Sequence, residues 1–290
     1  MAAPANITNS AAVNTALSEV AVKQFNGEYD RLASILGITK VKTVQAGHQL
    51  YQIEYTGDLD ATAYEEGDTV PLTKISAVKK PIEAIALKPY RRETTANAVL
   101  TAGVETAVIE TDKKVLSLIR NGVVGDFITT VKAGTGVAEG KTLQATIAAA
   151  IGTLSTSMES KGDAVNATLV IANTQDVYDY LGNATISSQN LFGMLYFQDF
   201  LGFGGLLATS KIDKGTVYVT DINNIKAYGV DMEGLNAAGF PYVSDENGII
   251  GVAHTPALEN FAVDSHFMVG VRFIAEVLNY TVKGTIKPSK

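Results

Sequence analysis

The chain has 290 residues, of which 46% are apolar and 18% are charged, and its formal net charge is −7. This composition excludes a disordered protein, and the negative charge argues against a protein whose affinity comes mainly from neutralising phosphates. The absence of cysteine excludes disulfides, thiolate nucleophiles and cysteine-based metal sites. The low charge content fits a surface covered by other copies of the chain, or simply a chain rich in Ala, Gly and Thr.

The amino-terminal region predicts a helix. Ser10 is a suitable cap for a helix that runs to about Leu36, where Gly37 would stop it, and Gly27 falls where it can split the helix in two. The amino terminus lacks the basic start and apolar run of a signal peptide. Because no stretch of eighteen apolar residues predicts a membrane span, we expect a protein made in the cytoplasm that does not meet a membrane.

From Val41 to about Lys80 the pattern predicts an extended ribbon. Residues Tyr51–Tyr55 alternate between apolar and polar, which is typical of a half-buried strand. Two strands of about 12 residues, joined through the polar segment that begins at Thr56, would reach about 40 Å at about 3.3 Å per residue. A two-stranded ribbon is marginally stable by itself in water, so we expect it to lie against another surface.

The ribbon separates its charges into two blocks. Six acids and no base lie between Glu54 and Asp68, and six bases and one acid lie between Pro71 and Arg92. Pairing within the ribbon would give only about 0.2–1 kcal/mol per exposed ion pair, and alternating charges would serve it equally well. Separate blocks fit two limbs that face different neighbours in a closed ring, where charge sets register and partner choice. The residues we expect at this contact between subunits are Glu65, Glu66, Asp68, Lys74, Lys79 and Lys80.

A returning strand and a long helix follow the ribbon. Pro81–Ala96 predicts the strand, and Ala98–Lys132 predicts the helix, with apolar residues close to one stripe. The interior glycines of this helix favour fraying or a break near Asn121. The segment Ala133–Gly140 predicts a linker between two domains.

Beyond this segment the pattern alternates as in an α/β domain. The tail His266–Val282 predicts a long strand that pairs with the returning strand. The other expected elements are helices over Thr142–Met158 and Gln175–Leu181 and strands over Thr168–Ala172, Val217–Thr220 and Ile225–Val230.

No motif predicts catalysis. In the segment Gly134–Thr142 a phosphate-binding loop would need glycine where Thr135 stands. In Leu201–Leu207 the last leucine replaces the third glycine of a dinucleotide fingerprint. The three histidines lack metal-ligand spacing, and the acids of the ribbon lack the EF-hand pattern. We therefore expect no enzyme, no catalytic residue, no cofactor and no metal.

The order of these pieces resembles the major capsid proteins of tailed bacteriophages, which have the Hong Kong 97-type shell fold. The resemblance covers about Val41 to the end. Its segments are Ala63–Ile75 (extended loop), Lys79–Ala96 (return strand), Gly103–Ile119 (spine helix), Thr168–Gly182 (axial strand and helix) and Phe267–Val277 (closing strand of the peripheral sheet).

The resemblance implies an α+β fold with four parts. Residues 1–40 would form an N-terminal arm and 41–80 an extended β-hairpin loop. Residues 81–135 and 262–290 would form a peripheral domain with a long spine helix and a sheet, and 136–261 an axial α/β domain.

The resemblance also implies a function. The protein would assemble into hexamers and pentamers of an icosahedral shell, enclose double-stranded DNA without reading its sequence, and become part of the virion after synthesis in the host cytoplasm. Its other partners would be a portal and decoration proteins. Since no long charged coiled coil precedes Val41, a separate scaffolding protein, or none, is implied. Some relatives cross-link Lys to Asn between subunits, a reaction that we do not predict here.

Three alternatives remain open. The same fold serves encapsulin-like compartments, which enclose enzymes in place of a genome. An enzyme that binds phosphate through Gly134–Thr142 is a rival from another class. A self-associating tail or surface-layer protein would form tubes or sheets in place of closed shells.

Overall fold

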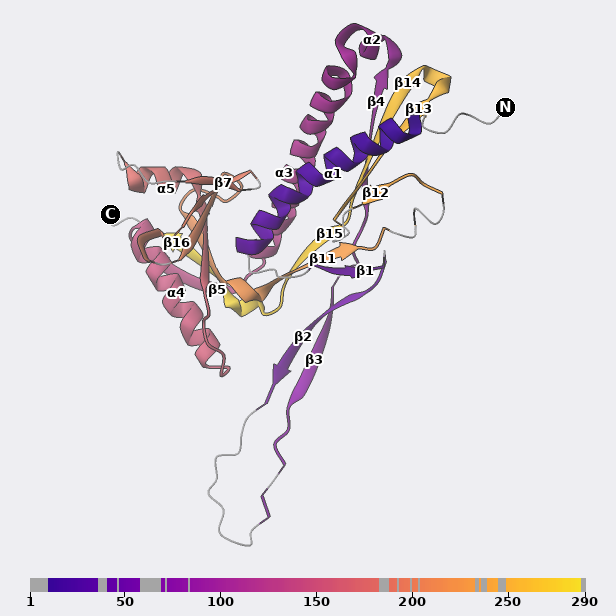
Figure 1. Cartoon of the computed structure of the whole chain (residues 1–290). Coiled ribbons are helices and arrows are strands. Elements are labelled where there is room, and N and C mark those ends of the chain that lie inside the picture. Colours follow the sequence, from indigo (N-terminus) through magenta and orange to yellow (C-terminus); the bar gives the residue numbers. More distant parts are fainter. Residues whose placement is uncertain are drawn as a thin grey trace.

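A computed structural model gives the fold of the chain (Figure 1). It describes residues 10–35, 41–45, 47–57, 69–70, 72–82, 84–182, 188–191, 193–198, 200–202, 204–232, 235, 239–244 and 249–287. None of the helices within these ranges is long and apolar enough to cross a membrane.

The described elements are five α-helices, a π-helical turn and sixteen strands. The helices are α1 (Ser10–Ile35), α2 (Ala96–Val104), α3 (Thr111–Lys132), α4 (Leu143–Glu159) and α5 (Thr174–Leu181), and the π-helical turn is Glu105–Glu110. The strands are β1 (Lys42–Val44), β2 (Leu50–Thr56), β3 (Ser76–Ile82), β4 (Lys88–Thr95), β5 (Gly136–Gly140), β6 (Thr168–Asn173), β7 (Gln189–Leu191), β8 (Met194–Phe197), β9 (Gly205–Thr209), β10 (Thr216–Asp221), β11 (Ile225–Val230), β12 (Val243–Ser244), β13 (Ile250–Ala257), β14 (Ala262–Val269), β15 (Val271–Ala275) and β16 (Thr281–Ile286).

One half of the molecule is built on the four-stranded sheet β12-β13-β14-β4, continued by the three-stranded sheet β1-β11-β15. The predicted pairing of the tail with the returning strand is confirmed for His266–Val269 only, which lie in β14 opposite β4. Two other expectations are wrong. The returning strand is divided into β3 and β4, and the tail strand is divided at Gly270, after which β15 pairs with β11. A Cβ at Gly270 would lie 2.8 Å from the side chain of Val230, so the chain crosses its neighbour closely there.

The predicted long helix is interrupted at a different glycine from the one expected. Gly103 has φ 79° and ψ 158°, and α2 ends beside it, whereas α3 runs without a break through Gly122 and Gly125. Phe127 and Val131 of α3 are fully buried, as a helix that packs on a sheet requires. Leu100 and Leu118, expected on the buried stripe, are 85% and 58% exposed.

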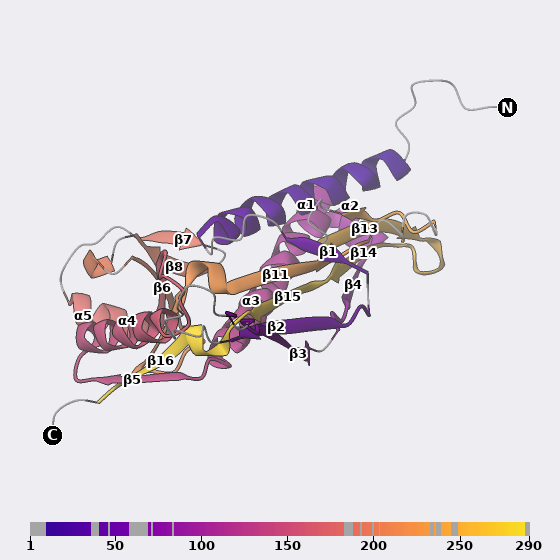
Figure 2. The same ribbon diagram turned by 90° about the horizontal axis from the view of Figure 1, so that it is seen from below.

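Helix α1 lies across β13 and α3 on one face of the body, and the ribbon β2–β3 lies on the opposite face (Figure 2). The helix is continuous through Gly27, so the predicted split does not occur. Its buried side chains continue the same core as α3, and they are Ala21, Val22, Phe25, Tyr29, Leu32 and Ala33.

The other half is the seven-stranded sheet β5-β16-β10-β6-β9-β8-β7, with α4 packed across β5, β10 and β16. The predicted helices and strands of this half are confirmed. Thr142 caps α4, because its side chain accepts a hydrogen bond from the backbone N–H of Ala145. Gly182 ends α5 with φ 56°, a conformation that favours glycine.

The segment predicted as a linker instead contributes a strand to this sheet. Residues Gly136–Gly140 form β5, which pairs in parallel with β16. Strand β16 lies within the predicted peripheral segment 262–290 but belongs to the seven-stranded sheet, and β13 pairs with β14 across the predicted boundary at residue 261. Strands that are far apart in the sequence pair with each other, so the sheets do not follow the predicted domain boundaries. The division into a peripheral and an axial domain stays a prediction.

Candidate assembly surface

Strands β2 and β3 form a separate two-stranded sheet that projects from the body (Figure 1). They pair antiparallel from Leu50 opposite Ile82 to Thr56 opposite Ser76. Each strand has seven residues, fewer than the 12 expected from the sequence. The predicted extended hairpin is therefore present, with a shorter paired part.

The base of this ribbon is fixed to the body. The side-chain amide of Gln52 donates hydrogen bonds to the backbone carbonyls of Glu276, at 2.6 Å, and Ala275, at 3.3 Å. Leu50 is buried in a small cluster with Ile85 and other apolar side chains. The ribbon is thus held at one end, while its paired strands extend away from the body (Figure 1).

The apolar face of the ribbon points away from the body. Because successive side chains of a strand alternate, Tyr51 and Ile53 point away from the side on which Gln52 contacts the body. The sequence predicted a half-buried strand here, but Tyr51, Ile53 and Tyr55 are 53%, 42% and 68% exposed. The strand has the expected alternation, and among the described residues its apolar side chains stay largely exposed.

The exposed apolar residues continue beyond the paired strands. Leu72 is 98% exposed, and Val70 and Ile75 are also exposed. The limbs stay close there, because a Cβ at Gly57 would lie 2.8 Å from the backbone oxygen of Lys74. We call this set the ribbon surface; its residues are Tyr51, Ile53, Tyr55, Val70, Leu72 and Ile75. Apolar side chains gathered this way mark a surface that contacts another molecule.

The predicted contact residues fall partly on this ribbon. Lys74, Lys79 and Lys80 are exposed, whereas Glu65, Glu66 and Asp68 lie outside the described residues. Within the part of the chain that the structure describes, neither Lys74 nor Lys79 forms an ion pair.

A second exposed apolar surface lies at the far end of the four-stranded sheet, where α2 meets the turn between β13 and β14 (Figure 1). Leu100, Leu258 and Phe261 are 85%, 78% and 76% exposed. Phe261 has φ 47°, and its carbonyl accepts a hydrogen bond from the backbone N–H of Ala96 at 2.6 Å, which fixes the turn to α2. We call these three residues the end surface. Sequence periodicity missed it because it assigned Leu100 to a buried stripe.

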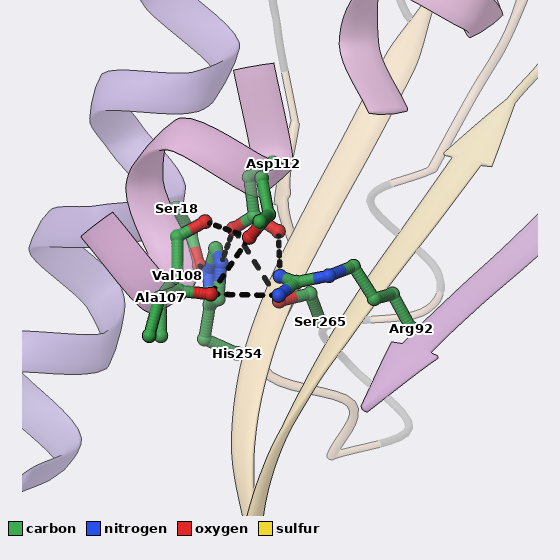
Figure 3. A network of polar contacts seen from close by, with 8 residues as sticks. Ser18, Arg92, Ala107, Val108, Asp112, His254 and Ser265 are labelled. Atoms are coloured by element: carbon green, nitrogen blue, oxygen red, sulfur yellow. Dashed lines mark hydrogen bonds and ion pairs between the residues drawn. The ribbon is translucent and has the colours of Figure 1, made fainter. Parts of the chain in front are cut away.

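A buried polar network joins elements that are far apart in the sequence (Figure 3). Asp112 of α3 accepts a hydrogen bond from Arg92 of β4 at 2.9 Å, and its other oxygen lies 2.7 Å from Nε2 of His254. The Nδ1 atom of His254 lies 2.7 Å from the hydroxyl of Ser18 in α1. Ser265 of β14 also donates to Asp112, at 3.3 Å. The network ties α1, α3, β4, β13 and β14 together.

Ser18, His254 and Asp112 are a combination that hydrolases use for nucleophilic catalysis, but their setting here differs. Ser18 is 1% exposed, so a substrate cannot reach its hydroxyl. Asp112 is shared with Arg92, whose guanidinium pairs with its other carboxylate oxygen. The arrangement suits a fixed joint between α1 and the sheet. Spacing along the sequence did not connect His254 with Asp112 and Ser18, because both are distant from it along the chain.

A neighbouring ion pair lies at the edge of the same sheet. Arg91 of β4 donates to Asp264 of β14 at 2.8 Å. This hydrogen bond, together with the negative charge of Asp264, raises the pKa of Arg91 above its usual value. The pair stabilises the alignment of β4 with β14 and leaves the guanidinium charged.

The proposed phosphate loop at Gly134–Thr142 is not a loop. Its centre is strand β5, whose backbone pairs with β16. A Cβ at Gly140 would lie 2.4 Å from the backbone nitrogen of Thr146, so the glycine serves close packing against α4. In the ranges that the structure describes, no three His, Asp or Glu side chains gather as metal ligands.

No protein-family model and no curated protein matches the sequence. The structure, in contrast, is similar to solved shell proteins. It matches a virus-like particle from Pyrococcus furiosus with a TM-score of 0.54 at 11% identity, over 91% of this chain and 97% of the other. It matches the capsid of an empty GTA particle with a TM-score of 0.56 at 10% identity, over 88% and 89%. For Gordonia phage Cozz the TM-score is 0.56 at 10% identity, over 89% and 87%.

The chain has the Hong Kong 97-type shell fold. This shell fold is the α+β architecture that the resemblance implied, with its extended loop, spine helix and two groups of strands. At about one identical residue in ten, the likeness concerns the arrangement of the chain. The roles of the ribbon surface and the end surface therefore have to be inferred from the residues of this chain.

Proposed function

We propose that the chain is a major capsid protein that assembles into an icosahedral shell around double-stranded DNA. The observation that carries the proposal is the ribbon surface, whose apolar side chains are exposed in the part of the chain that the structure describes. A projecting strand pair fixed only at its base is suited to lie over a neighbouring copy. The shell fold supports this reading, because similar folds occur in phage and virus-like particles.

Assembly in this proposal follows from repetition. Each ribbon lies on the next subunit, and a contact between two different surfaces generates a closed ring when its rotation closes. The axial part of each subunit meets its copies at the centre of hexamers and pentamers. Each contact is modest, and symmetry repeats it many times, so the shell is stable although one pair of subunits is not.

We infer no catalytic role for the chain. Its partners are copies of itself, together with a portal and scaffolding or decoration proteins where the virus has them. The charge blocks of the ribbon, including Glu65, Glu66, Asp68, Lys74, Lys79 and Lys80, set the register of the contact. The protein is a component of the virion after synthesis in the host cytoplasm.

The proposal is tested with the protein expressed by itself. Wild-type protein should form closed shells, visible by negative-stain electron microscopy and as fast-sedimenting particles. Tyr55→Ser with Leu72→Ser should leave folded subunits that do not close, because each large apolar side chain contributes about 1.5–3 kcal/mol when it is buried. Tyr178→Ser, which changes an exposed tyrosine of α5, is the matched control and should assemble normally.

Two results would count against the proposal. Wild-type protein that stays monomeric at high concentration would remove the shell function, and shells formed equally well by the ribbon variant would remove the ribbon contact. Tubes or sheets would favour the tail or surface-layer alternative. Particles that enclose protein cargo in place of nucleic acid would favour a compartment of the encapsulin type.

A further inference from the structure

A cationic cavity lies between α3 and the ends of strands β6 and β9. Its volume is about 530 Å³. Among the described residues that line it are three cations, Lys114, Arg120 and Lys211, and no Asp or Glu. We call this cavity the α3 groove. The polar side chains beside the cations are those of Ser117, Asn121, Thr174, Thr209 and Ser210.

The position of the α3 groove in the fold suits a ligand. Strands β6 and β9 are parallel neighbours. Thr174 follows the last residue of β6, and Lys211 comes two residues after the end of β9. In open α/β sheets, ligands bind outside the carboxyl ends of parallel strands, where the chain leaves the sheet. The cations of the groove are therefore at the edge of the sheet where binding sites form.

Two of the cations lie beside glycines, which have no side chain to fill the space. The Nζ atom of Lys211 lies 3.8 Å from where a Cβ at Gly125 would be, and Nε of Arg120 lies 3.7 Å from the corresponding position at Gly193. Lys114 is exposed at the other end of the groove. In the described part of the chain, Lys114 and Lys211 form no ion pair. Two of the three cations thus have no ion-pair partner among the described residues.

Some other lysines of the molecule do form ion pairs. Lys88 pairs with Asp126 at 2.5 Å, and Lys214 pairs with Asp179 at 2.7 Å. Because the chain has 30 acids and 23 Lys and Arg residues, acids are the commoner charge on its surface. Cations gathered in a cavity without any of those acids create a local positive potential that attracts an anion.

The length of the groove indicates a chain of anionic groups. Lys114 and Gly125, beside which Lys211 lies, are separated by about 16 Å along α3 at about 1.5 Å per residue. One small anion cannot contact cations at both ends. Phosphate oxygens accept several hydrogen bonds at once, and hydroxyl and amide donors, among them Ser117 and Asn121, line the groove between the cations.

We propose that the α3 groove binds consecutive phosphate groups of the nucleic acid inside the shell; this rests on the proposed function. Among the described residues that line the groove none is aromatic and could stack on bases, so the contact is independent of sequence. Three cations per subunit give a weak, salt-sensitive contact that the shell repeats at each copy. The α3 groove accordingly faces the interior of the shell.

The test compares two double variants with the same change in net charge. Lys114→Ala with Lys211→Ala removes the groove cations, and Lys42→Ala with Lys283→Ala removes exposed lysines outside the groove. Binding of a short fluorescent DNA duplex to unassembled subunits is measured by anisotropy at several KCl concentrations. The groove variant should reduce the slope of log K against log[KCl] by about 1.8, since each lost phosphate contact removes about 0.9. The control should keep the wild-type slope.

Several outcomes would overturn the proposal. Equal slopes for the groove variant and wild type, or an equal loss in the control, would mean that the groove is not the binding site. Displacement of the duplex by a Glu-rich peptide of equal charge would assign the groove to carboxylates of a protein. Displacement by inorganic phosphate at the same total phosphate concentration would show a site for single phosphate groups.

Shell formation separates this proposal from the function on which it rests. Electron microscopy of the groove variant should show normal shells, with less nuclease-protected nucleic acid than in the control. Normal shells with unchanged nucleic acid would overturn the groove site and leave the capsid function intact. Failure of the wild type to form shells would overturn the capsid function, whatever the groove binds.

Discussion

Asp112 is the residue on which the joint between α1 and the sheet depends. Its carboxylate contacts Arg92, His254 and Ser265, and His254 in turn contacts Ser18. The side chain of Asp112 is only 6% exposed, and that of Arg92 is 21% exposed. A buried charge that loses its partner is costly, so the network contributes mainly by keeping each charge paired.

Asp112→Ala should therefore lower the free energy of unfolding by about 3 kcal/mol, because it leaves Arg92 without its partner in a mostly buried site. The measurement is urea denaturation of unassembled subunits. Asp126→Ala is the matched control, since Asp126 pairs with Lys88 at the surface, and a change of at most about 1 kcal/mol is expected there. Equal losses in the two variants would contradict the role given to Asp112.

This network also marks a limit of sequence interpretation. His254 is 142 residues from Asp112 along the chain and 236 residues from Ser18. No local spacing connects them, and an isolated buried histidine is read from a sequence as a core residue. Gly134–Thr142, in contrast, could be rejected as a phosphate loop from the sequence, because Thr135 stands where glycine is required.

The predicted long helix is divided at Gly103, whose backbone conformation other residue types rarely adopt. Gly103 has φ 79° and ψ 158°, a region adopted almost only by glycine. The sequence suggested a break at Asn121, because glycines cluster there and all interior glycines weaken a helix alike. Packing distinguishes Gly103 from the glycines near Asn121. The face of α3 around Val123 and Phe127 is buried, and this burial keeps that part of the chain helical.

Two alanine substitutions test this difference. Gly103→Ala should destabilise the subunit by about 1–3 kcal/mol, because it forces a side chain into a strained backbone region. Gly122→Ala, in the interior of α3 with open space at its Cβ position, should stabilise by up to about 1 kcal/mol. Thermal unfolding followed by circular dichroism measures both. Changes of the same sign would show that the break at Gly103 is not enforced by its conformation.

Both helices of the seven-stranded half were predicted because each carries its own boundary signal, whereas only two of its seven strands, β6 and β10, were predicted. Thr142 caps α4, and Gly182 ends α5. Strand β5 was missed because its sequence, rich in glycine and alanine, reads as a linker. It is a strand because it pairs with β16, which comes from the C-terminal end of the chain. The local composition of residues 136–140 does not indicate this pairing.

The complete molecule presents two exposed apolar surfaces at different ends. The ribbon surface projects from one end, and the end surface lies where α2 meets the turn of β13 and β14 (Figure 1). The sequence indicated the first through its alternating pattern and charge blocks. It could not indicate the second, because Leu100, Leu258 and Phe261 meet only in the fold. A closed shell needs one contact to form rings and another to join them, and two separate surfaces meet this need.

Leu258→Ser with Phe261→Ser should therefore block assembly after the ring stage. The fold should be unaffected, because both side chains are more than three-quarters exposed in the subunit. Sedimentation velocity should show rings in place of shells, whereas the ribbon variant should stop at the single subunit. Full shells from the end-surface variant would mean that rings are joined elsewhere.

The strand edges of the ribbon also matter for the newly made subunit before it assembles. Both strands of the ribbon have an outer edge with unpaired backbone groups, and such edges can add strands from other molecules without limit. Lys79, Lys80 and Pro81 follow one another on β3. Positive charge repels a second identical edge, and proline removes a donor from it. The same three residues thus protect the protein from forming fibrils during synthesis.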